Sequence, residues 1–176
     1  MLFSERSIWT MVHGIGLGGA ALLGLAAALF SLYAVRPASR STDTEPGWRA
    51  FASLTVFTAV MLWLTVIVGT YIIFPPYRVT PPPGTTDLSQ YPRAFVLANA
   101  GTAWLHAFAM EIKEHLPWIA TMLTTAVAFI AVRYPGAALR NPSLRKTSFT
   151  LLAISFAIVV FVSLLGVFVN KVAPLD

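Results

Sequence analysis

Four long apolar runs alternate with polar segments along the 176-residue chain. They cover residues 8–35, 50–74, 116–133 and 149–169. A helix needs about 20 apolar residues to cross the hydrocarbon core of a membrane, and only helices and closed barrels satisfy their backbone polar groups in lipid. The runs lack the alternation of barrel strands. The pattern therefore predicts an all-α integral membrane protein whose four transmembrane helices form a single domain.

The polar segments between these runs predict how the helices pair. The segments after the first and third runs are short, so we expect two antiparallel helical hairpins. The second segment, residues 75–93, is longer and contains six prolines. Proline-rich segments favour extended polyproline II structure. This external loop is either a spacer between the hairpins or a strap that lies against a partner's external domain.

A charged stretch, "WLHAFAMEIKEHLPW", comes directly before the third run, at residues 104–118. Plotted as a helix, it has one apolar face and one polar face. Proline is favoured in the first turn of a helix and disruptive in its interior, so Pro117 indicates that the third transmembrane helix begins near Leu116. Residues 94–114 are then predicted to form an amphipathic helix that lies along the membrane interface.

Composition excludes a soluble protein. Hydrophobic residues make up 57% of the chain and charged residues only 11%, whereas soluble domains carry about 25% charged residues. The first run is also longer than the roughly 7–15 apolar residues of a signal peptide. We therefore expect the first run to be a membrane anchor.

The formal net charge is +5, and the basic residues are distributed unevenly along the chain. Seven lie in or beside the two short loops: Arg36, Arg40, Arg49, Arg133, Arg140, Arg145 and Lys146. The remaining five are Arg6, Arg78, Arg93, Lys113 and Lys171. The positive-inside rule predicts cytoplasmic short loops, with both termini and Thr85 outside the bacterial inner (plasma) membrane. Orientation explains the basic charge, so no nucleic-acid partner is expected.

The chain has no cysteine, which excludes disulfides, thiolate-bound iron–sulfur clusters and covalently attached c-type haem. A metal or redox centre would depend on the three histidines, all of which are predicted near the outer boundary of the membrane. His13 heads a face of small residues that includes Gly16 and Ala20. Such a face allows close approach of another helix or of a flat ligand.

The other two histidines lie in the charged stretch. His115 borders its apolar face, and Glu111 is one turn earlier, where it could orient the imidazole ring. His106 points about 180° away from His115 on a straight helix, beside Lys113. We therefore choose His115 as the partner of His13 and keep His106 as the alternative ligand.

Two histidines from antiparallel helices, beside a glycine-rich face, are what a bis-histidine b-type haem requires. The layout resembles that of small four-helix membrane cytochromes. We expect one haem b, with His13 and His115 as iron ligands, Gly16 and Ala20 beside the ring, and Glu111 orienting His115. The protein would be a small subunit of a respiratory or photosynthetic electron-transfer complex, and at most an electron-transfer subunit rather than an enzyme.

Its expected partners are other membrane subunits, lipid and quinol, with Glu111, Glu114 or His106 accepting the protons of quinol. The alternative is a non-catalytic structural or accessory subunit of a larger membrane complex, without a cofactor of its own. A third hypothesis is a divalent-metal site formed by His106, His13 and either Glu111 or Glu114. The apolar runs carry almost no ionisable groups, which argues against a transporter or proton pump.

Overall fold

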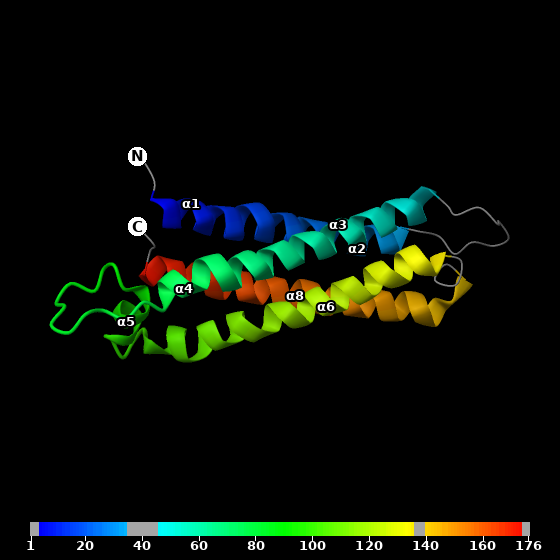
Figure 1. Cartoon of the computed structure of the whole chain (residues 1–176). Helices are drawn as coiled ribbons and strands as arrows, with labels where there is room; N and C mark the ends of the chain where they lie inside the picture. Colours follow the sequence, from blue (N-terminus) through cyan, green and yellow to red (C-terminus); the bar gives the residue numbers. More distant parts are fainter. Residues whose placement is uncertain (1–3, 35–45, 136–139, 174–176) are drawn as a thin grey trace.

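The computed structural model describes residues 4–34, 46–135 and 140–173, and its four long helices lie side by side as a bundle (Figure 1). The first combines α1 (Glu5–Met11), η1 (Val12–Gly18) and α2 (Gly19–Ala34). The second combines α3 (Pro46–Val68), η2 (Gly69–Ile73) and α4 (Phe74–Tyr77). The third combines η3 (Leu105–Met110) and α6 (Glu111–Arg133), and the fourth is α8 (Pro142–Val172). The short helix α5 (Pro92–Leu97) comes before the third.

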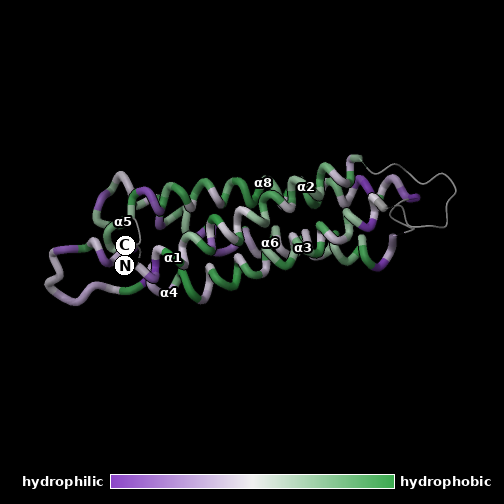
Figure 2. Tube along the Cα trace, turned by 90° about the horizontal axis from the view of Figure 1, so that it is seen from above, coloured by the Kyte–Doolittle hydropathy of each residue, from purple (hydrophilic) through white to green (hydrophobic). Residues whose placement is uncertain are grey.

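Each long helix is apolar and long enough to cross a membrane. The spans are Glu5–Ala34, Gly47–Tyr77, Leu105–Arg133 and Pro142–Val172. Hydrophobic residues dominate the middle of the bundle, and hydrophilic residues gather towards its two ends (Figure 2). The prediction of an all-α membrane protein with four transmembrane helices and a short helix before the third is confirmed.

The helices form a closed ring in which each contacts two neighbours. Helix α2 packs against α3, α3 against α6, α6 against α8, and α8 against α2. The start of α1, the loop between α4 and α5, and the end of α8 lie at one end of the bundle (Figure 1). We call this the histidine end, and the opposite end, where α3 begins, the Trp48 end. Arg36 and Arg40 lie outside the described residues, and which end faces the cytoplasm stays a prediction.

The boundaries before the third helix differ from the expected ones. The helix begins at Leu105 rather than near Leu116, Pro117 lies inside it, and the short helix is Pro92–Leu97 rather than residues 94–114. The segment before the proline is held by tertiary packing. Its apolar face, including Leu105 and Ala109, is buried in a hydrophobic cluster with residues of α8. This burial keeps the chain helical where local sequence favours a new start.

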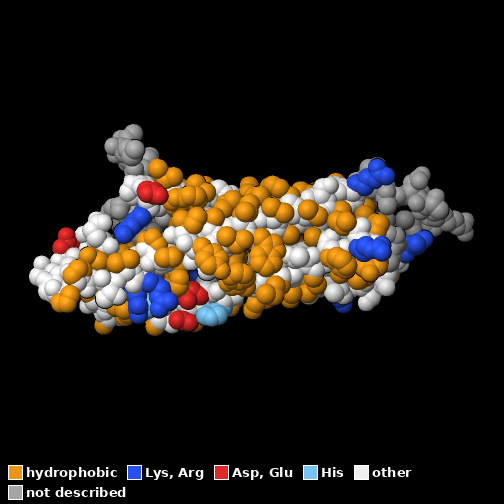
Figure 3. All heavy atoms as spheres, in the orientation of Figure 1, with side chains coloured by type: hydrophobic (Ala, Val, Ile, Leu, Met, Phe, Trp, Pro, Cys, Tyr) orange, Lys and Arg blue, Asp and Glu red, His pale blue; other side chains and the backbone are white. Residues whose placement is uncertain are grey.

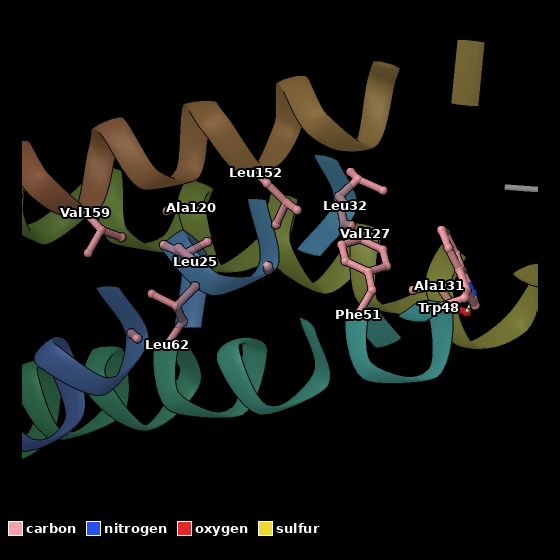
Figure 4. Close-up of a cluster of buried hydrophobic side chains, with 12 residues drawn as sticks. Leu25, Leu32, Trp48, Phe51, Leu62, Ala120, Val127, Ala131, Leu152 and Val159 are labelled. Carbon is pink, nitrogen blue, oxygen red and sulfur yellow. Dashed lines mark hydrogen bonds between the residues drawn. The ribbon is translucent and has the colours of Figure 1, made fainter. Parts of the chain in front are cut away.

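The main hydrophobic cluster lies in the interior of the bundle and extends to the Trp48 end (Figure 4). Trp48 and Phe51 are buried, with ring centroids 5.0 Å apart. The Trp48 indole Nε1 donates a hydrogen bond to the carbonyl oxygen of Ala131 at 2.9 Å. A large aromatic side chain thus joins α3 to α6 and satisfies its one polar atom, as a buried tryptophan must.

Candidate functional site

Three π-helical segments distinguish the histidine end from the rest of the bundle. They are η1, η2 and η3, and each belongs to a different long helix. Segment η1 packs against α3 and α8, α1 packs against η2, and η3 packs against α8. A π turn closes its hydrogen bond over five residues instead of four, is rare, and occurs frequently at functional sites. The three π-helical segments make this end of the bundle the candidate functional site.

His13 lies in η1 and faces the second long helix. A Cβ atom at Gly69 would lie 2.8 Å from Cε1 of the His13 ring, so the imidazole occupies the space that a side chain would need. The ring hydrogen-bonds to the backbone of Thr65. Its Nδ1 is buried and has no hydrogen-bond partner within the described part of the chain.

The hydrogen bonding of the His13 ring is incomplete at Nδ1, which is buried and has no partner in the described part of the chain. Leaving such a buried group unsatisfied costs about 1–3 kcal/mol. The His13 ring is therefore an incomplete hydrogen-bonding site.

Lys113 reaches the same region from the third long helix. Its side chain is half-buried, and a Cβ atom added at Gly166 would lie 3.3 Å from Nζ. The charge of Lys113 acts on His13. Among residues 4–34, 46–135 and 140–173, no hydrogen bond or ion pair of Lys113 is found. A lysine within a membrane-spanning segment is costly to retain.

Each long helix thus contributes one residue to what we call the His13 layer: His13, Gly69, Lys113 and Gly166. Gly69 comes 20 residues after Arg49, and Gly166 comes 20 residues after Lys146. At about 1.5 Å per residue, the layer lies about 30 Å from the charges near the Trp48 end. That distance matches the thickness of a hydrocarbon core. The layer therefore lies at one edge of the apolar zone.

His115, the predicted partner of His13, is on the opposite face of its helix. It is exposed, and its Nδ1 lies 2.7 Å from the backbone oxygen of Glu111. Residues 113 and 115 are about 200° apart on an α-helix, so when Lys113 faces inward His115 must face outward. The pairing of His13 with His115 stays a prediction. Glu111 contacts His115 through its carbonyl oxygen, and its carboxylate makes no hydrogen bond to the ring among the contacts that the structure describes.

The small-residue face of the first helix is divided. Gly24 packs against Thr58 of α3, so closely that a Cβ atom at Gly24 would collide with the Thr58 hydroxyl oxygen. Gly16 is exposed, and a Cβ atom there would meet nothing within 4 Å. Ala20 is half-buried. Only part of the predicted face therefore contacts another helix of this chain.

His106 belongs to a separate polar cluster. Its Nδ1 lies 3.2 Å from the Tyr77 hydroxyl, and the charges of Arg93 and Glu114 act on its ring. No group of three or more His, Asp or Glu side chains that could hold a metal ion exists in the described ranges. The three-ligand site proposed for His13, His106 and a glutamate is thus absent from that part of the chain. On the surface drawn in Figure 3, acidic, basic and histidine side chains lie close together near the histidine end.

Comparisons with protein-family models, curated proteins and solved structures find no significant match to this chain. Of the predicted residues, only His13 lies in the layer that we describe. Lys113 and the two glycines were not predicted as site residues.

Proposed function

We propose that the protein is a small integral subunit of a larger membrane electron-transfer assembly, and that the His13 layer binds a polar group at the outer edge of the bundle. One observation carries this proposal. The buried Nδ1 of His13 has no hydrogen-bond partner in the described part of the chain, and the charge of the half-buried Lys113 acts on this histidine. Intramembrane ionisable residues are expensive to retain and are usually functional.

We also propose an orientation of the protein in the membrane, based on the distribution of its basic residues. The described basic residues at the Trp48 end include Arg49, Arg133, Arg140 and Lys146. The positive-inside rule assigns this end to the cytoplasm and the His13 layer to the outer leaflet.

The function is tested by isolating the tagged chain, expressed at its native level, in a mild detergent. We expect it to migrate with other membrane subunits and to carry a redox centre or a bound redox carrier. Native-gel mass, a reduced-minus-oxidised absorption spectrum and mass spectrometry of the extracted small molecules measure these properties. A monomer without any such group would contradict the proposal. A larger assembly without redox centres would support the accessory-subunit alternative instead.

A b-type haem is the second candidate, and the geometry of His115 favours it. A histidine that binds a metal through one nitrogen usually donates its other N–H to a carbonyl or carboxylate. The Nδ1 of His115 lies at hydrogen-bonding distance from the oxygen of Glu111, which leaves Nε2 available at the exposed surface of α6. His115 is exposed within this chain, so we propose that a neighbouring subunit supplies the second axial ligand.

The spectrum of histidine variants tests this candidate. If a haem is bound in this way, His115→Ala abolishes the reduced-minus-oxidised b-type bands of the isolated assembly, because the iron loses an axial ligand. His106→Ala leaves the bands intact, because His106 is engaged with Tyr77. Loss of the bands in His13→Ala as well would indicate that His13 and His115 ligate together after a rearrangement. Loss in His106→Ala alone would contradict the assignment of His115.

A further inference from the structure

We infer that Tyr77 is a redox-active tyrosine, and that its phenolic proton passes to His106 when the ring loses one electron. The inference adds a residue to the proposed electron-transfer function. It rests on that function for the natural oxidant, a one-electron redox centre of a partner subunit. The hypotheses based on sequence do not include this role, because they treat His106 as an alternative haem or metal ligand or as an acceptor of protons from quinol.

The two side chains meet where the external loop leaves and re-enters the bundle. Tyr77 is the last residue of α4 and His106 lies in η3, so both are at the histidine end (Figure 1). The Tyr77 hydroxyl oxygen lies 3.2 Å from Nδ1 of His106, and the ring centroids are 5.9 Å apart. Within residues 4–34, 46–135 and 140–173, the Tyr77 hydroxyl makes no other hydrogen bond. We therefore assign the phenolic O–H as the donor and Nδ1 as the acceptor.

The Tyr77 ring is enclosed by apolar groups, whereas His106 reaches the surface. Tyr77 is 4% exposed and belongs to a hydrophobic cluster that includes Val96 of α5 and Leu105 of η3. Its ring also stacks against Phe74, with centroids 6.3 Å apart. His106 is half-buried, so a proton that it accepts can exchange with water at this end of the bundle.

The fate of the proton decides whether a buried tyrosine can be oxidised. Loss of an electron alone would leave a charged phenol in an apolar site, which is costly. If the proton moves to Nδ1 as the electron leaves, the O–H bond breaks and an N–H bond forms. The products are a neutral phenoxyl radical, an imidazolium and an oxidant reduced by one electron. A backbone carbonyl could also satisfy the hydroxyl, but it is too weak a base to hold the proton.

Photo-oxidation of the full chain in phosphatidylcholine nanodiscs tests the inference. The chain has no cysteine, so Val79→Cys provides a single attachment site for a ruthenium tris-bipyridine photosensitiser, on an exposed residue close to Tyr77 in the chain. A cobalt(III) ammine complex removes the electron from the excited ruthenium, and the resulting ruthenium(III) is the oxidant. Electron paramagnetic resonance and transient absorption detect tyrosyl radicals. We expect a tyrosyl radical that Tyr77→Phe removes, because phenylalanine keeps the ring without the hydroxyl.

His106→Gln separates proton transfer from hydrogen bonding, because glutamine keeps an acceptor for the hydroxyl but is not a base. A positioned general base contributes about 10²–10⁴-fold, so radical formation should slow by at least roughly tenfold. Tyr91→Phe is the matched control. Tyr91 precedes α5 at the same end of the bundle, and no hydrogen bond of its hydroxyl to a histidine is found in the described ranges. This variant should form the radical as the Val79→Cys parent does.

Four outcomes would overturn the inference: no tyrosyl radical, a radical that persists in Tyr77→Phe, an equal loss in Tyr91→Phe, or equal rates in His106→Gln and its parent. If His106→Gln does not accumulate, the parent in D2O replaces it. Proton transfer slows radical formation in D2O, and equal rates in the two solvents would contradict the role of His106.

The proposed function fails separately, by isolation of a monomer without a redox group, whatever the photochemistry of Tyr77. An assembly that carries redox centres, but in which Tyr77 is not oxidised by the tethered ruthenium, would retain the function and exclude this residue.

Discussion

The two ends of the bundle differ in how their interior is packed. At the Trp48 end, large side chains such as Trp48 and Phe51 fill the space between regular α-helices, and the Trp48 indole finds its acceptor within the bundle. At the histidine end, the helices include π turns, and glycines leave room for His13 and Lys113. Packing alone needs neither a buried imidazole nor a buried ammonium group. One end is thus filled by large apolar side chains, whereas the other holds ionisable side chains beside glycines.

The largest expected effect is on stability at the Trp48 end. Trp48→Ala removes a buried aromatic ring and its hydrogen bond to Ala131, and should lower the free energy of unfolding by about 3–5 kcal/mol. Reversible unfolding in mixed detergent micelles measures this loss. Trp104→Ala is the matched control, because 47% of the Trp104 surface is exposed. Equal losses in the two variants would erase the distinction between a packed end and an open end.

A smaller effect is expected midway along the first helix. Gly24→Ala forces a methyl group against Thr58 and should cost about 1–3 kcal/mol, as overpacking commonly does. Gly16→Ala adds the same methyl group where nothing lies within 4 Å and should change stability by less than about 0.5 kcal/mol. Unfolding of the isolated chain compares the two variants. The bulkier Gly16→Leu then separates lipid contact from subunit contact, because it disrupts the native assembly only if a partner covers Gly16.

A small effect on stability, and a specific one on the site, is expected for Gly69→Ala. The new Cβ atom would lie 2.8 Å from Cε1 of His13, so the imidazole must shift. We expect a change in unfolding free energy of less than about 1 kcal/mol, because alanine favours the helix more than glycine does by a similar amount. The His13 ring should move, which the NMR chemical shifts of its imidazole measure. Gly14→Ala, with open space around its Cβ position, should leave these shifts unchanged; an equal change in both variants would contradict the role of the Gly69 contact.

The sequence was sufficient to predict the architecture, because each apolar run is long enough to cross the hydrocarbon core as a helix. The number of spans and the short helix before the third follow from the chain alone. The start of the third helix could not be predicted because Pro117 acts locally, whereas burial of Leu105 and Ala109 depends on α8. Tertiary packing overrode the local signal.

The site was only partly predictable for a related reason. His13 was identified because an intramembrane histidine needs a partner, and the structure places its ring against Gly69. The sequence placed Lys113 beside His106 and gave it no role in the site, because the rotation of the charged stretch about its axis depends on the helices around it. The π turns have no simple sequence signature, and uniform α-helical winding misplaces the residues that they contain. Cofactor, partners and membrane sidedness stay predictions.

The π winding of η1 also makes residue number a determinant of the site. A π turn takes up one residue more than an α turn, so Val12–Gly18 contains more residues than an α-helical segment of the same rotation would hold. If the same residues wound as a regular α-helix, the part before them would turn by about 100° relative to α2 for each extra residue, and His13 would leave Gly69 although every site residue was still present. Composition and hydropathy would not change. The winding of the backbone, as well as the identity of the residues, therefore determines whether the layer forms.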